Sequence, residues 1–112
     1  MANKESGIQR LILDYLKSQR YYVWRNYVGP ILHGGSGKQV FSKNPASGMP
    51  DIMGLLKDGS GRLFAIEVKT ETGRLSELQK IRIAELKKHG VIAFVARDLQ
   101  TVVRELMQAN ET

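Results

Sequence analysis

Hydrophobic residues recur along the chain at two different spacings, and each spacing predicts a different kind of element. Apolar side chains that return every three or four positions predict amphipathic helices over residues 4–19, 75–88 and 99–108. Short segments rich in β-branched, aromatic and other apolar residues predict strands over residues 21–28, 51–57, 63–69 and 91–96. The resulting order, α-β-(β)-β-β-α-β-α, predicts an α/β (α+β) fold.

Residues 29–50 interrupt this pattern with glycine and proline, and only Lys38–Phe41 has the composition of a short strand. The segment therefore reads as a glycine-rich, basic loop insertion, suited to act as a flap against DNA. A phosphate-binding P-loop is excluded, because Leu32 stands where its first glycine belongs and Gln39 where Ser or Thr belongs. We expect no nucleotide cofactor.

The length of 112 residues indicates a single domain spanning 1–112. No cysteine is present, so disulfides and thiolate metal sites are excluded. The N-terminal residues lack the apolar core of a signal peptide, and no apolar run has the length of a membrane span. We expect a cytoplasmic protein without a membrane partner.

Basic residues outnumber acidic ones by 17 to 11, which gives a formal net charge of +6. A positive field of this kind favours polyanions, above all nucleic acid, although a merely soluble basic protein has the same composition. Many of the basic side chains fall outside the apolar runs and are free to follow phosphates: Arg20, Arg25, Lys38, Lys43, Arg74, Lys80, Arg82, Lys87 and Lys88.

Two acidic residues and a lysine flank a predicted hairpin in the middle of the chain. Asp51 follows Gly48-Met49-Pro50, and Glu67-Val68-Lys69 lies fifteen residues further on. The turn signal Asp58-Gly59-Ser60-Gly61 separates the two strands. Because side chains alternate between the faces of a strand, the odd-numbered Asp51, Glu67 and Lys69 converge only if opposite positions sum to an even number.

A three-residue loop, Gly59-Ser60-Gly61, meets this condition by pairing Asp58 with Arg62. In this register Asp51 faces Lys69 and Met53 faces Glu67. On the other face, the register predicts apolar pairs that pack on a helix: Ile52 with Val68, Gly54 with Ile66, and Leu56 with Phe64. A two-residue turn would separate the acids, so the site requires an odd loop or a bulge.

Two carboxylates beside an ammonium are suited to metal-dependent phosphodiester hydrolysis. Mg²⁺ and Mn²⁺ prefer oxygen ligands and need neither His nor Cys. Each motif alone has a bland explanation, since Glu-Val-Lys is common at a solvated strand edge and Asp after Pro is common in a turn. Their combination in a basic protein favours a site.

These residues resemble the PD-(D/E)XK nuclease signature and, more narrowly, the virus-type replication-repair nuclease (VRR-NUC) family. Pro50-Asp51 and Glu67-Val68-Lys69 form the signature. Glu5 and Gln9 on the first helix and Leu75-Ser76-Glu77-Leu78-Gln79 extend the resemblance over nearly the whole chain. Ser76, with Gln79 three positions later, also predicts a capping box at the start of a helix. The resemblance implies a restriction-endonuclease-like core, in which helices flank a central mixed β-sheet, and divalent-metal-dependent cleavage of DNA.

The resemblance also implies a role for each residue of the site. Asp51 and Glu67 are expected to bind Mg²⁺ or Mn²⁺, and Lys69 to be the catalytic lysine. Glu5 is expected to reach the metal through water or to position a second ion. The Val68 backbone carbonyl is expected as a further ligand. Residues expected at lower priority are Gln79, which would hold Lys69 or the nucleophile, and the DNA contacts Lys38, Lys43, Arg74 and Lys80.

The resemblance to phage and bacterial Holliday-junction resolvases implies a structure-selective endonuclease acting on branched DNA. Cutting two symmetric strands requires two active sites, so a homodimer is expected. A non-catalytic DNA-binding module and a nuclease subunit of a larger complex remain alternatives. His33 and His89 are assigned no catalytic role. Trp24 and its neighbouring tyrosines, Tyr21, Tyr22 and Tyr27, are expected in the core or a dimer interface rather than against bases, although contact of the exposed half of this strand with DNA remains an alternative.

Overall fold

A computed structural model of the chain describes residues 4–35 and 37–111. All the predicted helices and the four predicted strands are present in it, with ends that differ by a few residues. In chain order the elements are α1 (Lys4–Ser18), β1 (Val23–Arg25), β2 (Ile31–Gly35), β3 (Lys38–Ser42), β4 (Ile52–Leu55), β5 (Leu63–Val68), α2 (Glu77–Lys88), β6 (Ile92–Ala96) and α3 (Leu99–Glu111).

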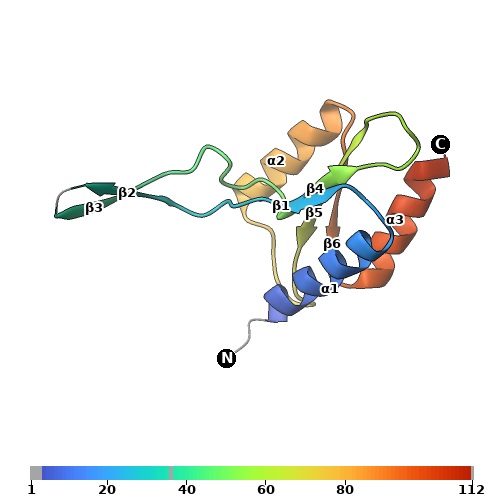
Figure 1. Cartoon of the computed structure of the whole chain (residues 1–112), viewed down its shortest axis with the longest axis horizontal. Coiled ribbons are helices and arrows are strands. Elements are labelled where there is room, and N and C mark those ends of the chain that lie inside the picture. Colours follow the sequence, from blue (N-terminus) through green and yellow to red (C-terminus); the bar gives the residue numbers. More distant parts are fainter. Residues whose placement is uncertain (1–3, 36, 112) are drawn as a thin grey trace.

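A four-stranded sheet forms the centre of the molecule, in the order β1-β4-β5-β6. β1, β4 and β5 are antiparallel neighbours, whereas β6 runs parallel to β5. The helix α2 covers one face of the sheet, and α1 and α3 cover the other (Figure 1). The predicted fold class, a mixed sheet flanked by helices, is confirmed. No helix in the described residues is long and apolar enough to cross a membrane.

Side-chain alternation along β5 divides the core between the two faces. Phe64, Ile66 and Val68 are fully buried against α1 and α3. Ala65 faces the other way and packs with Met53 of β4 under α2. Burial of a large apolar side chain such as Phe64 or Ile66 stabilises the fold by about 1.5–3 kcal/mol. The sheet is thus fixed from both sides at the strand that carries Glu67.

The β4–β5 register differs from the prediction by two residues. Ile52 pairs with Ile66 and Met53 with Ala65, so opposite positions sum to an even number but not to the predicted one. The predicted pairing of Ile52 with Val68 is wrong because the connection over residues 56–62 is centred on Gly59, whereas the predicted loop is centred on Ser60. Within the observed connection, Asp58 Oδ1 accepts a hydrogen bond from the Ser60 N–H over 3.0 Å. The even sum is preserved, so Asp51 and Glu67 still lie on the same side of the sheet.

The segment between Gly29 and Pro50 is a β-hairpin with flanking loops rather than a loop with one short strand. β2 pairs with β3 along its whole length, and His33 Nε2 lies 2.6 Å from Ser42 Oγ across the pair. The strand Ile31–Gly35 was missed because its glycines weaken the strand signal. The hairpin projects from the body, which gives the molecule extents of 53 × 34 × 27 Å (Figure 1).

The aromatic residues around β1 divide between the core and the surface. Tyr21 packs against the core, with its ring edge-on to Phe64 at a centroid distance of 5.6 Å. Tyr22, Trp24 and Tyr27 are exposed to 72%, 37% and 68%, so the prediction that they lie in the core is wrong. β1 is a three-residue edge strand with burial on one side only, which explains their exposure. Their place in a dimer interface stays a prediction.

Candidate active site

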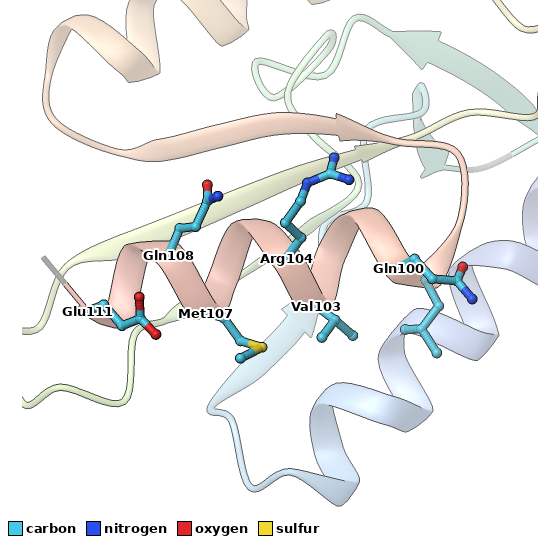
Figure 2. A pocket seen from close by; sticks show the side chains of 7 residues that line it. Gln100, Val103, Arg104, Met107, Gln108 and Glu111 are labelled. Atoms are coloured by element: carbon cyan, nitrogen blue, oxygen red, sulfur yellow. The ribbon is translucent and has the colours of Figure 1, made fainter.

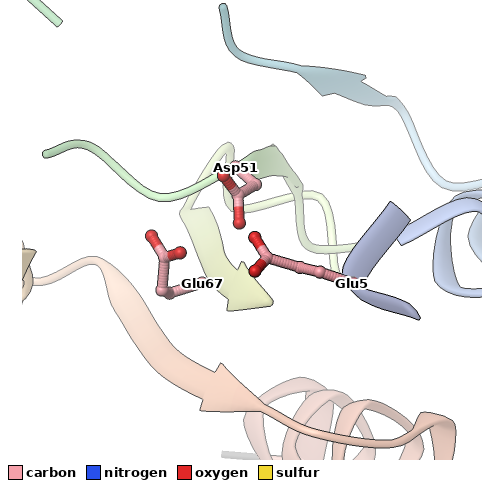
Figure 3. A group of neighbouring side chains, drawn as sticks. All are labelled: Glu5, Asp51 and Glu67. Atoms are coloured by element: carbon pink, nitrogen blue, oxygen red, sulfur yellow. The ribbon is translucent and has the colours of Figure 1, made fainter. Parts of the chain in front are cut away.

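Three carboxylates from three separate segments meet at one end of the sheet. Glu5 comes from the first turn of α1, Asp51 directly precedes β4, and Glu67 lies near the end of β5. One oxygen of each lies within 4.8 Å of the others, and the three side chains point toward a common centre (Figure 3). The observed register explains the closeness of two of them, because extending the Ile52–Ile66 pair by one position sets Asp51 opposite Glu67.

Hydrogen bonds on both sides hold Asp51 in place. Its Oδ2 accepts the Val68 N–H over 3.0 Å. Its main-chain carbonyl accepts the Asn26 N–H over 2.8 Å, and the Asn26 side chain donates to the Pro50 carbonyl over 2.8 Å. Asn26, which directly follows β1, therefore holds the main chain of Pro50 and Asp51 in place. Sequence reasoning missed this residue, since a single Asn after a strand is an ordinary loop residue.

A second polar contact ties the start of α1 to β1. Gln9 lies one helical turn after Glu5, is 8% exposed, and accepts a hydrogen bond from an Arg25 amino group over 2.9 Å. Arg25 itself follows Trp24 on β1 and pairs with Ile52, the residue after Asp51. The Gln9–Arg25 bond thus fixes the helix that carries Glu5 relative to the strand that carries Asp51.

Glu67 is the most buried of the three acids, with 1% of its side chain exposed. Its Oε2 lies 3.4 Å from Gln79 Nε2 and 3.9 Å from Lys69 Nζ. Its Oε1 is buried and has no hydrogen-bond partner among the described residues. Burial, reinforced by the neighbouring Asp51, raises the pKa of Glu67 to about 9. In the absence of a cation, the carboxyl group holds its proton at neutral pH.

Gln79 reaches Glu67 from the first turn of α2. Ser76 caps this helix by accepting the Gln79 N–H over 3.1 Å, and Gln79 Oε1 accepts the Ser76 N–H over 2.9 Å, so the predicted capping box is present. With its oxygen held there, the amide nitrogen of Gln79 points to Glu67. Its observed partner is therefore Glu67, whereas the sequence led us to expect Lys69 or the nucleophile.

The chain beyond Lys69 is closed by Arg97. One guanidinium nitrogen of Arg97 donates to the carbonyls of Thr70, Glu71 and Gly73, over 2.6, 3.3 and 2.7 Å. The Lys69 N–H also donates to the Ala96 carbonyl over 3.1 Å. Lys69 is consequently anchored by its backbone to β6, and its side chain is only 12% exposed.

Gly48 seats the segment that carries Asp51 against α2. Its φ is +81°, and an added Cβ would lie 2.5 Å from Leu78 Cγ. Gly59 has the same φ with open space around it, which makes it a matched control. We expect Gly48→Ala to lower the free energy of unfolding by about 1–3 kcal/mol more than Gly59→Ala, because only the former adds a clash to the backbone strain. Urea unfolding measures both, and equal losses would contradict the close seating on Leu78.

The basic residues expected to contact DNA come from separate segments of the chain. Arg74 follows the turn closed by Arg97, and Lys80 is exposed on α2, where it pairs with Glu77 over 3.2 Å. Lys43 is exposed just after β3, and the side chain of Lys38 lies outside the part of the chain that the structure describes. Contact of these residues with DNA stays a prediction.

An open hollow elsewhere on the surface is unrelated to the acids. It has a volume of about 480 Å³ and follows the outer face of α3, where Val103, Arg104 and Met107 line it (Figure 2). None of the residues of the acidic cluster lines it. The hollow is mostly apolar and offers no group of side chains suited to hydrolysis.

Comparison with known proteins identifies the family. The model of the VRR-NUC domain matches residues 3–98, most of the chain. The chain belongs to the VRR-NUC family. A solved structure described as a VRR_NUC domain superposes on this VRR-NUC chain with a TM-score of 0.63 and 21% sequence identity, and the match covers 92% of this chain and 94% of that one. No curated protein matches the sequence.

Because the chain belongs to the VRR-NUC family, the acidic cluster lies within a nuclease-type fold. The resemblance stated from the sequence is confirmed, and the fold agrees with that of the solved VRR_NUC domain. The cluster of Glu5, Asp51 and Glu67 offers carboxylate oxygens from three directions and is chemically suited to a divalent cation. The VRR-NUC fold makes DNA the natural substrate class for a chain with a net charge of +6.

Proposed function

We propose that this VRR-NUC chain is a divalent-metal-dependent endonuclease that hydrolyses DNA phosphodiester bonds at Glu5, Asp51, Glu67 and Lys69. The observation that carries the proposal is that one oxygen of each of the three carboxylates lies within 4.8 Å of the others. In addition, Glu67 Oε1 is buried without a hydrogen-bond partner among the described residues. Like charges at this distance repel one another, so an arrangement of this kind needs a proton or a cation to be stable at neutral pH.

The donor atoms fit Mg²⁺ or Mn²⁺. All three side chains supply hard oxygen atoms, and the described residues bring no His or Cys to the cluster. Asp51 and Glu67 would bind the ion, Glu5 would contribute directly or through water, and the Val68 carbonyl would add a main-chain oxygen. Bound in this way, a divalent ion neutralises phosphate charge and lowers the pKa of a bound water molecule.

The remaining residues of the site offset negative charge or keep the acidic side chains in position. Lys69 carries its ammonium 3.9 Å from Glu67 Oε2, where it offsets negative charge that builds on the phosphorus-bound oxygens as water attacks and the leaving oxygen departs. Gln79 donates to Glu67 Oε2, and Glu67 Oε1 has no hydrogen-bond partner among the described residues. The Val68 N–H keeps the Asp51 carboxylate from rotating away, and Asn26 holds the main chain of Pro50 and Asp51 in place.

We further propose that the preferred substrate is branched DNA of the Holliday-junction type, cut by a homodimer. A symmetric junction presents two equivalent strands, and two identical sites related by a twofold axis match that symmetry. The projecting β2–β3 hairpin would extend the contact surface of each subunit beyond its own active site.

A cleavage assay with several DNA forms tests the proposal. Labelled four-way junction, flap, linear duplex and single strand are each incubated with Mg²⁺, Mn²⁺ or EDTA, and the products are resolved on denaturing gels. We expect cleavage with either metal, fastest on branched DNA, and none in EDTA. Equal cleavage in EDTA would refute the metal site. Binding of branched DNA without cleavage by the folded protein would instead identify a non-catalytic module or a subunit that needs its complex.

A further inference from the structure

Two exposed aromatic rings lie side by side at the edge of the sheet: Tyr22 directly precedes the edge strand β1, and Trp24 lies on it. Tyr22 is 72% and Trp24 37% exposed, and their ring centroids are 5.9 Å apart at an interplanar angle of 76°. Trp24 pairs with Met53, so it lies on the same side of the sheet as Asp51 and Glu67. Within a soluble fold, adjacent exposed aromatic rings on an edge strand indicate a binding surface.

Hydrogen bonds connect this Tyr22–Trp24 pair to the site. Trp24 Nε1 donates to Asn26 Oδ1 over 3.1 Å. Through its other groups, the same Asn26 binds the carbonyls of Pro50 and Asp51. Met53, the partner of Trp24, lies two residues from Asp51, which is about 7 Å along a strand.

The charge around the pair favours nucleic acid over an ordinary protein partner. No Asp or Glu occurs between Asp14 and Asp51, although lysines and arginines do. All the aromatic residues of the chain except Phe64 and Phe94 lie in the same stretch. Exposed basic side chains in it include Arg20, Arg25 and Lys43. Aromatic rings interspersed with basic residues are the composition of surfaces that stack unpaired bases and track their phosphates.

We propose that the Tyr22–Trp24 pair binds an unpaired base of the substrate strand and presents the neighbouring phosphodiester to the acidic cluster. The inference rests on the proposed nuclease function and deepens it, because it names the substrate class. DNA with unpaired nucleotides near the cut, such as a flap, a single strand or a junction opened at its exchange point, is bound better than blunt duplex.

The tryptophan itself reports on the contact, because Trp24 is the only tryptophan in the chain. The protein is titrated in EDTA, so that no cleavage occurs, with a short oligothymidylate or with blunt duplex of the same length. We expect the oligothymidylate to quench the Trp24 emission in a saturable way and the duplex to leave it nearly unchanged. Equal responses to both, or no response to either, would overturn the inference.

Variants separate base stacking from general charge attraction. We expect Tyr22→Ala to weaken oligothymidylate binding about 10-fold and Tyr22→Phe to retain it, because stacking needs the ring and not the hydroxyl. Met107→Ala removes a comparably exposed side chain from the distant hollow along α3 and should bind like the wild type. Trp24→Ala, measured by anisotropy of a labelled oligonucleotide, should lose about as much as Tyr22→Ala. Wild-type affinity in both alanine variants would refute the role of the pair.

Two further outcomes would show whether the base-binding proposal or the nuclease proposal has failed. If the Trp24 emission changes on dilution of the protein without DNA, in step with a change of mass in light scattering, the pair is an interface between two copies, and the inference is wrong. If oligothymidylate is bound as expected but no DNA is cut with any metal, the pair stands as a base-binding surface and the nuclease proposal fails. If Tyr22→Ala and Trp24→Ala bind oligothymidylate like the wild type and still cleave DNA, the nuclease proposal stands and the base-binding role of the pair is refuted.

Discussion

Asp51→Asn is expected to reduce Mg²⁺- or Mn²⁺-dependent DNA cleavage by about 10³-fold or more while the protein remains folded. The substitution keeps the shape of the side chain, and the amide oxygen still accepts the Val68 N–H that now binds Oδ2. It replaces the other oxygen with an NH₂ group, which cannot bind a cation, and removes the negative charge that Asp51 brings to the cluster. Single-turnover cleavage of a labelled junction at saturating metal measures the loss.

A matched control keeps the same change of charge away from the site. Asp14→Asn alters an exposed residue of α1, the helix that also carries Glu5, and should leave the cleavage rate within a factor of about two. Thermal unfolding of both variants checks that the fold is retained. If Asp51→Asn cuts DNA within about 10-fold of the wild type, the acidic cluster is not the catalytic site. If both variants lose activity equally, the loss reflects net charge and not the site.

Side-chain alternation is the reason that the meeting of Asp51 and Glu67 could be predicted from the sequence. The rule is local, because it depends only on the strand backbone and on the parity of the register. Parity alone does not determine the exact register. The register also depends on how the chain turns between the two strands, where Asp58 Oδ1 accepts hydrogen bonds from the N–H and the hydroxyl of Ser60. The prediction therefore placed the acids on one face but opposed Asp51 to Lys69 in place of Glu67.

The parts of the site that sequence missed depend on contacts between distant segments. Asn26 acts through the carbonyls of Pro50 and Asp51, and Gln9 through Arg25. Gln9 was part of the resemblance, but its contact with Arg25 was not expected from the sequence. Asn26 belongs to no periodic pattern, so nothing in the linear order distinguishes it from other polar residues. Gln79 shows the intermediate case: its capping box is a local signal and was predicted, whereas its contact with Glu67 needed the packing of α2 on the sheet.

Glu67→Gln is expected to stabilise the metal-free protein at alkaline pH and to abolish its stabilisation by metal. In the folded protein, burial followed by the neighbouring Asp51 raises the pKa of Glu67 to about 9, from 4.5 for the unperturbed group. Between these values the folded state keeps a proton that the unfolded chain has released. The free energy of unfolding therefore falls as the pH rises, by about 1.4 kcal/mol per pH unit from this group alone. An amide at this position has no such dependence.

Urea unfolding in EDTA at a series of pH values measures the difference between wild type and variant. We expect the two to approach each other near pH 5 and the variant to be more stable by a few kcal/mol near pH 8. The nearby Lys69 ammonium, 3.9 Å away, favours the ionised carboxylate and limits the difference. Glu111→Gln, at the exposed end of α3, controls for the loss of one negative charge. A wild type whose stability runs parallel to that of Glu67→Gln would contradict the raised pKa.

Metal addition then separates a cation site from a merely protonated carboxyl group. A divalent ion competes with the proton for Glu67, so Mn²⁺ should raise the melting temperature of the wild type more at about pH 8 than at about pH 5. Glu67→Gln should show little increase at either pH, because one of the three carboxylates is gone and the buried Oε1 no longer carries charge. An equal increase in both proteins would show that the metal binds elsewhere. Stabilisation confined to the wild type, and growing with pH, would connect the buried Glu67 carboxyl group directly to cation binding.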